Sequence, residues 1–422
     1  MAVRHPVRRR GTDRAPLVFG MATAVGLLHA VDDAVLHRQP GVPVGQHLPA
    51  LVAVTVVAIA GIVLFARLRT GLRAATALLF GGVTLTNGAM HTIHVAVNEL
   101  SGSDLTGLLA TAAGGVLVAM SALLPFLHRG ERHTSTARRW ALRGAAVAGT
   151  VALVMLVLMP IGVAIGQTHL FRVPIEDPPD DGYEVVTFSS EDGLDLAGWY
   201  APSRNGAAVV VVNSSGGDRL GSVDHAELLA RHGYGVLLYD ARGTGLSEGS
   251  PNGYGWGWDA DVAGAISYLR DRPDVDEDRI GGLGLSTGAD VLIEVAAEDR
   301  GLRSVVADGA TIRSLADIPA GEPLNKVIMA PTLSAVSLLS GTRPGAPLKE
   351  LAARVSPTPL LLVAAGSIPQ EIPVNTTYAE AAEESAELWT LPRARHTRAI
   401  RDQAEAYEQR IVRHFNRSLL SH

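Results

Sequence analysis

The sequence predicts an all-α transmembrane bundle of five helices, followed by an α/β domain with a doubly wound, mostly parallel sheet. Three observations carry this prediction. Hydrophobic residues make up 47% of the 422 residues, and before residue 168 they gather in long uninterrupted runs. After residue 182, short apolar runs alternate with helical segments, as in a parallel sheet covered on both faces. The two parts also differ in net charge. Up to Gly166 the chain has fourteen arginines and six acidic residues, a net charge of +8, whereas the net charge of the whole chain is −6.

Five apolar runs are long enough to cross about 30 Å of hydrocarbon, which needs roughly 20 residues each. They lie at residues 17–36, 49–66, 74–97, 105–127 and 144–166. The first run follows an arginine-rich segment, as a signal peptide would, but it lacks an A-x-A-like cleavage site and four more runs follow. We therefore expect a retained membrane domain over residues 1–168, joined by an acidic, proline-bearing linker at 169–182.

The arginines predict the orientation of this domain, because positive residues stay on the cytoplasmic side. Thirteen of the fourteen lie before the first run, between the second and third, or between the fourth and fifth, and Arg38 is the exception. This alternation predicts a multi-pass protein of the cell membrane with a cytoplasmic amino terminus and an extracytoplasmic carboxyl-terminal domain. That domain is acidic and lacks a basic surface interleaved with aromatic residues, which excludes nucleic acid as a partner.

Two predicted spans contain ionisable residues. The segment "HAVDDAVLH" places His29, Asp33 and His37 on one helical face, and "MHTIHVAV" places His91 and His94 on another. Ionisable groups at this depth are costly and usually functional, and carboxylate with imidazole suits zinc or another divalent metal. Mutual neutralisation of Asp and His needs no further ingredient and is favoured over a metal site or a proton path.

The α/β domain is predicted over residues 183–422. It opens with two alternating strands around the turn "EDG", which form a hairpin, and continues with the apolar run "AAVVVV" of a central strand. The later strands are expected at 234–240, 279–285, 302–308, 357–366 and 386–392. The helices are expected at 224–233, 259–271, 288–298 and 404–420. In such sheets, sites form where strands end.

A serine between two glycines marks the candidate nucleophile. In "GGLGLSTGAD", Ser286 lies between Gly284 and Gly288, after a buried strand and before a helix. This is the context of a sharp strand-to-helix turn that exposes a hydroxyl at a helix amino terminus. The motif alone is common by chance in a glycine-rich chain, and its place between strand and helix is what makes it specific.

A serine needs a base to remove its proton, and the base needs an acid to hold it. His396 lies in a loop before the last helix, whereas His414 lies within that helix and His422 is the terminal residue, so His396 is the predicted base. For the acid, Glu371 in the loop after "LLLVAAG" is favoured over Asp308 at the end of "SVVAD", because a loop carboxylate can approach the histidine loop.

The oxyanion of an acyl-transfer intermediate needs backbone N–H donors, each worth roughly 3 kcal/mol. The N–H of Thr287, directly after the nucleophile, and that of Ser215 in the loop "NSSGG" are the candidates. The chain has no cysteine, which excludes thiol nucleophiles and thiolate metal sites. The predicted serine chemistry requires no cofactor.

Residues 183 to 420 resemble the α/β-hydrolase superfamily, in its dienelactone-hydrolase and prolyl-oligopeptidase-like branch. The resemblance rests on "VTFSSEDGLDLAGWY", "VVVVNSSGGDR", "YDARGTGLSEG", "GLGLSTG" and "PRARH". It implies the fold and a serine mechanism. Two positions depart from it: Asn213 stands where many relatives have the histidine of His-Gly, and Pro369 stands at the usual place of the aspartate.

These features predict a membrane-tethered serine hydrolase that cleaves acyl or lipid esters. A serine peptidase or acyltransferase would use the same residues. From another class, a membrane sensor or transport protein whose outer domain only binds a ligand is the alternative. The segment 311–355 lies where relatives insert lids, and its apolar part "NKVIMAPTLSAVSLLSG" would either cover an acyl chain or pack as a core helix.

Overall fold

The computed structural model describes residues 13–97, 100, 102–127, 136–169, 172, 175, 177–319 and 321–420. The chain divides into two compact units, Met1–Arg38 with Val44–Ile165 and Gln39–Pro43 with Gly166–His422. Several arginines of the orientation argument and the terminal histidine lie outside the described residues, namely Arg4, Arg8, Arg9, Arg10, Arg129, Arg132 and His422.

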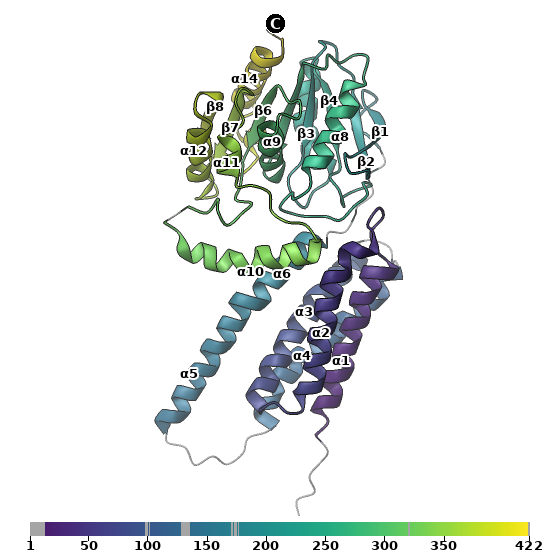
Figure 1. The fold of residues 1–422 in the computed structure, drawn as a ribbon, viewed down its shortest axis with the longest axis vertical. Coiled ribbons are helices and arrows are strands. Elements are labelled where there is room, and N and C mark those ends of the chain that lie inside the picture. Colours follow the sequence, from purple (N-terminus) through teal and green to yellow (C-terminus); the bar gives the residue numbers. More distant parts are fainter. Residues whose placement is uncertain are drawn as a thin grey trace, which may run out of the picture. The chain divides into compact units, whose positions relative to one another are not determined.

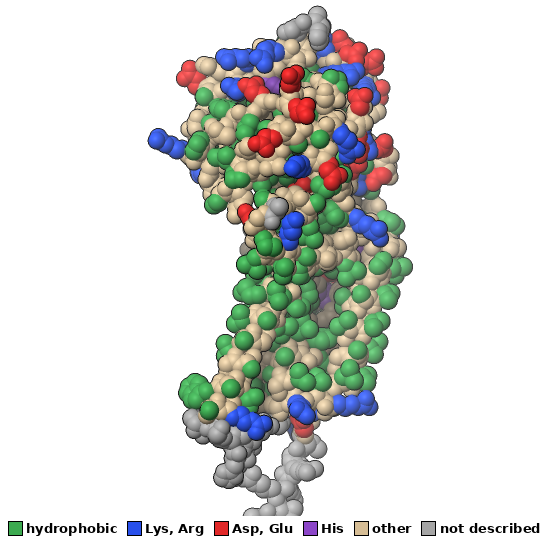
Figure 2. All heavy atoms as spheres, turned by 60° about the vertical axis from the view of Figure 1, so that its left-hand side comes forward, with side chains coloured by type: hydrophobic (Ala, Val, Ile, Leu, Met, Phe, Trp, Pro, Cys, Tyr) green, Lys and Arg blue, Asp and Glu red, His purple; other side chains and the backbone are tan. Residues whose placement is uncertain are grey.

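The secondary structure of the first unit is helical over the described residues, as its apolar runs predict. Its α-helices are α1 (Ala15–Val31), α2 (Val44–Phe65), α3 (Thr70–Val97), α4 (Gly102–Leu127), α5 (Thr136–Leu153) and α6 (Met159–Thr168). Single π-helical turns continue α1 over Asp32–Leu36 and join α5 to α6 over Val154–Leu158. Hydrophobic side chains cover much of the face of this bundle that Figure 2 shows, as expected for a surface that faces lipid.

Among the described residues, four helices are long and apolar enough to cross a membrane: Ala15–Leu36, Val44–Phe65, Asp104–Pro125 and Trp140–Thr168. The expected third span forms as α3 and has sufficient length, but its composition is less apolar than that of the others. Four of the five expected spans thus have the composition of a membrane-crossing helix, whereas glycine, threonine, asparagine and histidine occupy much of α3.

Small residues allow α3 and α4 to pack at very short range. A Cβ atom added to Gly88 would lie 2.4 Å from the backbone nitrogen of Thr111, and one added to Gly114 would lie 2.5 Å from that of Leu85. In membranes, where apolar burial drives helices together only weakly, such close backbone approach is a main source of association. The α3–α4 pair is the most extensive helix contact of the bundle as described.

The second unit is built on one eight-stranded sheet (Figure 1). Its strands are β1 (Glu184–Ser189), β2 (Asp195–Ala201), β3 (Ala208–Val212), β4 (Gly235–Tyr239), β5 (Ile280–Leu285), β6 (Ser304–Asp308), β7 (Leu360–Ala365) and β8 (Ala386–Leu391). They lie in the order β1-β2-β4-β3-β5-β6-β7-β8. The β1–β2 and β2–β4 pairs are antiparallel and all others are parallel, so the predicted doubly wound, mostly parallel sheet is confirmed.

Helices cover both faces of the sheet and bury two hydrophobic cores. One face carries α8 (Asp259–Arg270), α9 (Thr287–Ala297), α11 (Leu348–Ala352) and α12 (Glu371–Ala382). The other carries α7 (Val223–Arg231), α13 (Ala399–Asp402) and α14 (Ala404–Phe415). Because both faces are covered, the central strands β3 to β7 are buried throughout, which explains why they appear in the sequence as unbroken apolar runs.

The segment between β6 and β7 contains a helix that stands apart from these layers, α10 (Pro323–Ser340). Its amino-terminal half exposes Leu324, Val327 and Ile328, whereas Leu333 and Val336 are buried. The helix therefore buries apolar side chains in its second half and exposes apolar side chains in its first half.

Candidate active site

The turn between β5 and α9 holds Ser286, the candidate nucleophile, in a strained backbone conformation. Ser286 has φ 52° and ψ −115°, a backbone conformation that residues other than glycine rarely adopt. A Cβ on Gly284 would lie 2.3 Å from the carbonyl oxygen of Gly288, and a Cβ on Gly288 would lie 2.3 Å from that of Val212. Both positions therefore require glycine, because backbone atoms occupy the space of a side chain.

The structure brings His396 and Glu371 together. The His396 Nδ1–H donates to Oε2 of Glu371 at 2.7 Å, and the backbone N–H of Ala365 donates to Oε1 at 2.6 Å. Glu371 is buried and is the first residue of α12, so the expected loop at this position is in fact a helix start. The His396 backbone N–H donates to the hydroxyl of Ser367 at 2.8 Å, which ties the histidine loop to the loop after β7.

The histidine ring lies beside the backbone that neighbours the serine. Strands β5 and β6 pair with Leu285 opposite Asp308, and the N–H of Ser286 donates to the carbonyl of Asp308 at 2.8 Å. The next residue, Gly309, has φ +77°, and a Cβ added there would lie 2.7 Å from Cε1 of His396. The absence of a side chain at Gly309 thus lets the imidazole lie against the strand end next to the serine.

Asp308, the other candidate acid, has a different partner. Its Oδ2 accepts the phenolic O–H of Tyr407 at 2.9 Å, in the interior between β6 and α14. Burial raises the pKa of Asp308 to about 7, since the Tyr407 hydrogen bond and the positive potential of His396 offset only part of the cost of desolvating its charge. Asp308 therefore contributes to the packing below the site and makes no hydrogen bond to His396 in the described structure.

Opposing effects act on the pKa of His396. Burial disfavours the charged imidazolium and lowers the pKa, but the hydrogen bond and charge of Glu371, with the charges of Asp308 and Asp290, outweigh it. The net effect raises the pKa of His396 above its ordinary value. Because Nδ1 is used by Glu371, the lone pair of a neutral ring is at Nε2, which is the nitrogen a general base needs.

The candidate oxyanion donors lie in two segments that meet at the serine turn. Thr287 is the first residue of α9, and its hydroxyl donates to the carbonyl of Gly253 at 3.1 Å. Ser215 lies in the turn that follows β3, the strand beside β5. The Asn213 side chain donates to the carbonyl of Asp218 and so closes this turn, which gives a structural role to the residue that replaces the usual histidine.

One polar residue of the site was missed in the sequence. Asp290 follows Ser286 by one helical turn. Its carboxylate accepts two hydrogen bonds from Thr311, one from the backbone N–H at 2.7 Å and one from the hydroxyl at 2.5 Å. Asn375 and Tyr378 hold the same loop by donating to the carbonyls of Ala310 and Thr311. An aspartate one turn after the serine, in the mostly apolar helix "GADVLIEVAA", was the signal that could have revealed it.

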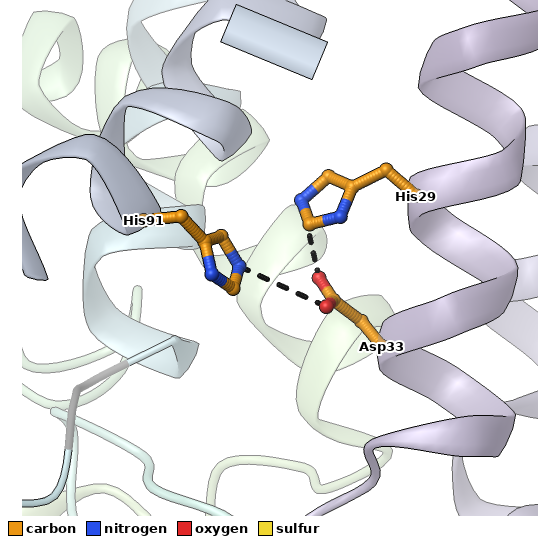
Figure 3. Close-up of side chains that lie close together, drawn as sticks. All are labelled: His29, Asp33 and His91. Atoms are coloured by element: carbon orange, nitrogen blue, oxygen red, sulfur yellow. Dashed lines mark ion pairs between the residues drawn. The ribbon is translucent and has the colours of Figure 1, made fainter. Parts of the chain in front are cut away.

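Of the candidate metal ligands, the helical unit brings His29, Asp33 and His91 together (Figure 3). His94 instead donates through Nδ1 to Asp104 at 3.1 Å. His37 Nδ1 lies 2.8 Å from Asp32 Oδ1, and neither residue belongs to the cluster. The cluster therefore has three members rather than the five that the helical spacing suggested.

Known proteins match the second unit of the chain. A family model described as X-Pro dipeptidyl-peptidase (S15 family) matches residues 177–395, more than half of the chain. The uncharacterized protein Rv2307c of Mycobacterium tuberculosis is 35% identical over 141 residues, 31% of this chain, and the chain spans about half of that protein's length, 50%. The uncharacterized protein YfhR of Escherichia coli is 29% identical over 261 residues, which is 59% of this chain and 86% of that protein.

Among solved structures, the esterase Pf2001 of Pyrococcus furiosus is similar with a TM-score of 0.49 and 24% identity, over 59% of this chain and 97% of that one. The strand order, the strained serine turn and the histidine–carboxylate pair agree with the family match. The chain therefore belongs to the X-Pro dipeptidyl-peptidase (S15) family, and its second unit is a hydrolase domain of the α/β-hydrolase fold.

Proposed function

We propose that the hydrolase domain cleaves carboxylic esters through a covalent acyl-enzyme on Ser286. The observation that carries the proposal is the coincidence of three features at one sheet edge. Ser286 is held at positive φ at the start of α9, His396 lies against Gly309 on the adjacent strand end, and Glu371 orients His396 through a 2.7 Å hydrogen bond. Nucleophile, base and orienting acid together are what an unactivated hydroxyl requires.

In the first half of the proposed reaction, the Ser286 hydroxyl oxygen attacks the ester carbonyl and His396 Nε2 accepts its proton. The negative oxygen of the tetrahedral intermediate binds the backbone N–H groups of Thr287 and Ser215. The C–O bond to the leaving alcohol then breaks as His396 returns the proton to that alcohol. In the second half, a water molecule takes the alcohol's place, and the acid leaves with Ser286 restored.

An uncharged acyl group suits this site better than the amino terminus of a peptide. A peptidase that removes dipeptides must hold a protonated amine, and a buried cation needs a carboxylate partner. The buried carboxylates of the described part of the site are already bonded: Asp290 to Thr311, Glu294 to Arg313, Asp308 to Tyr407 and Glu371 to His396. Peptide cleavage is the second candidate, because the matching family is described as a peptidase.

The position and the apolar surface of helix α10 favour an acyl substrate. Its last residue, Ser340, contacts Asn252 at 3.3 Å, and the neighbouring Gly253 accepts the hydroxyl of Thr287 beside the nucleophile. Its other end exposes the apolar side chains of Leu324, Val327 and Ile328. We propose that α10 contributes an apolar surface over which the hydrocarbon part of the substrate lies.

For the whole chain, we propose five membrane crossings, with α3 counted among them, and an extracytoplasmic hydrolase domain. The support is the alternating placement of arginines and the length of α3, 28 residues. The cysteine-free chain offers a direct test with single cysteines at the exposed positions Arg67 and Ser334. In intact cells, a membrane-impermeant maleimide should label S334C and spare R67C, and the reverse pattern would contradict the orientation.

The enzymatic proposal is tested with the full chain in detergent. A fluorophosphonate probe should label the wild type and fail to label Ser286→Ala, whereas an unlabelled wild type with a normal unfolding transition would favour a ligand-binding protein. The bond type follows from kcat/KM on a panel of p-nitrophenyl acyl esters and of X-Pro dipeptide p-nitroanilides. Faster cleavage of the anilides would replace the esterase by the peptidase.

A further inference from the structure

A polar cluster lies inside the helical unit, which is not the unit that contains the hydrolase site. His29 in α1 and Asp33 in the following π-helical turn share one helical face, and His91 faces them from α3 (Figure 3). His29 Nε2 lies 3.4 Å from Asp33 Oδ2, and His91 Nε2 lies 3.7 Å from Asp33 Oδ1. One ligand atom from each of the three residues lies within 4.8 Å of the others.

Hydrogen bonds determine which nitrogen of His29 carries the proton. The Thr106 hydroxyl donates its hydrogen to Asp32 Oδ2 at 2.6 Å, so toward His29 it acts as the acceptor. His29 Nδ1, at 3.1 Å from this hydroxyl oxygen, is therefore the donor. In a neutral ring the lone pair is then at Nε2, which is buried, makes no hydrogen bond in the described structure and points at the Asp33 carboxylate.

His91 is oriented in the same way by a carboxylate. Its Nδ1–H donates to Oδ1 of Asp104 at 3.0 Å, and Asp104 is fully buried on α4. His91 Nε2 is thereby aimed at Asp33. A carboxylate on the outer nitrogen of a histidine whose other nitrogen is a ligand is the usual arrangement around protein-bound zinc, since it fixes the ring and raises its basicity.

The contacts within the cluster, between Asp33 and the two histidines, are longer than the outer contacts that the cluster and its neighbours make through Thr106 and Asp104. The outer contacts, at 2.6 to 3.1 Å, have hydrogen-bond lengths. The inner contacts, at 3.4 and 3.7 Å, exceed the roughly 2.7–2.9 Å of a charge-assisted N–H···O bond. Bonds of about 2.0–2.2 Å at a tetrahedral angle separate two ligand atoms of one ion by roughly 3.3–3.6 Å. The 3.4 Å contact lies within this range and the 3.7 Å contact lies slightly above it. Direct Asp–His pairing, the simpler sequence interpretation, explains the contacts to Asp104 and Asp32 at hydrogen-bond length, and it explains the contacts to Asp33 as longer ion pairs.

We propose that His29, Asp33 and His91 bind a Zn²⁺ ion within the membrane domain. Two imidazole nitrogens and one carboxylate oxygen are suitable zinc ligands, and three protein ligands leave a fourth position for water or for an oxygen atom of a bound molecule. The ion would place positive charge between the Asp33 carboxylate and the Nε2 atoms of the two histidines, in a partly buried site. Asp104 is a positioning residue that acts through His91.

Close packing by a glycine maintains the arrangement. A Cβ added to Gly107 on α4 would lie 2.3 Å from Cγ of His91, so any side chain there would displace the ring. Gly115, two turns along the same helix, has no atom within 4 Å of an added Cβ. The two glycines therefore form a matched pair, of which only one supports the proposed site.

Metal analysis of the full chain tests the proposal. The protein, purified in detergent and treated with chelator, is reloaded with Zn²⁺ and dialysed, and zinc is counted by mass spectrometry. We expect about one ion per chain in the wild type and a loss of it in His29→Gln and His91→Gln. His37→Gln, which changes a histidine on the same helical segment outside the cluster, should retain the ion, as should Ser286→Ala.

Two further measurements separate a lost ligand from a lost fold. Co²⁺ in place of zinc should give the visible absorption of a four- or five-coordinate site, directly in the wild type. Asp104→Asn and Gly107→Ala should weaken zinc binding by about 10–100-fold, the usual effect of changing an outer partner, while Gly115→Ala should not. A wild type that keeps a normal unfolding transition but binds no zinc above the level of His29→Gln would overturn the proposal, and so would binding lost equally in His37→Gln.

Discussion

Replacement of Glu371 by glutamine is the sharpest test of the proposed catalytic site. Glu371 Oε2 lies 2.7 Å from His396 Nδ1, and the two side chains are 3% and 25% exposed. When His396 accepts the serine proton it becomes positive, and two unit charges about 4 Å apart attract by about 4 kcal/mol at an effective dielectric constant of 20. At about 1.4 kcal/mol per tenfold change, Glu371→Gln should lower kcat/KM by about 10³-fold.

Glutamine adds a second effect, because its amide N–H₂ can donate to Nδ1 and select the wrong tautomer, which extends the expected loss toward about 10⁴-fold. The assay is kcat/KM on a p-nitrophenyl acyl ester, with Asp308→Asn as the matched control. Since Asp308 bonds Tyr407 and not His396, we expect Asp308→Asn to retain activity within about tenfold. Near-normal activity in Glu371→Gln, with a collapse in Asp308→Asn, would refute this reasoning.

Four further outcomes are expected. Only the neutral ring of His396 accepts a proton and its pKa is raised, so kcat/KM should rise with pH through that raised pKa and vanish below it. Glu371→Gln removes the charge that raises the pKa, so it should move this rise in the pH profile to lower pH. A rise that does not move would belong to another group. Gly288→Ala, whose Cβ would lie 2.3 Å from the Val212 carbonyl oxygen, should reduce fluorophosphonate labelling by about 100-fold, whereas Gly321→Ala, with open space, should not. Tyr407→Phe should lower the free energy of unfolding by about 1–3 kcal/mol in denaturant titration, because it removes the partner of a buried carboxyl. Val327→Asp on α10 should lower kcat/KM for long-chain esters more than for short-chain ones, and an equal effect on both would exclude acyl contact there.

Several features could be predicted from the sequence because they depend on neighbours along the chain. The serine turn is local: the apolar strand, the two glycines and the helix lie within 281–298, and backbone sterics alone restrict Gly284 and Gly288. Parallel strands buried on both faces likewise appear as apolar runs, so the sheet was predictable. His396 was selected by elimination among few downstream histidines.

The identity of the histidine's partner depends on side chains that are distant in sequence. Asp308 is the last residue of β6 and Glu371 follows the neighbouring strand β7, so the order of elements places both at the carboxyl ends of the strands. The packing of α14 distinguishes the roles of the two carboxylates. Tyr407 on α14 donates a hydrogen bond to Asp308, whereas Glu371 accepts the hydrogen bond of His396. The start of α12 at Glu371 was also hidden, because Pro373 suggests a loop although proline is tolerated in the first turn of a helix.

The membrane domain shows the same division. Helical periodicity placed His29 and Asp33 on one face, since their spacing is a property of a single helix. The sequence offered His91 and His94 together as candidate ligands, but it did not reveal which of them completes the cluster, or that Thr106 and Asp104 orient the two rings. Those contacts join three helices whose approach depends on glycines between them, and interhelical distance has no signature in the periodicity of any one helix.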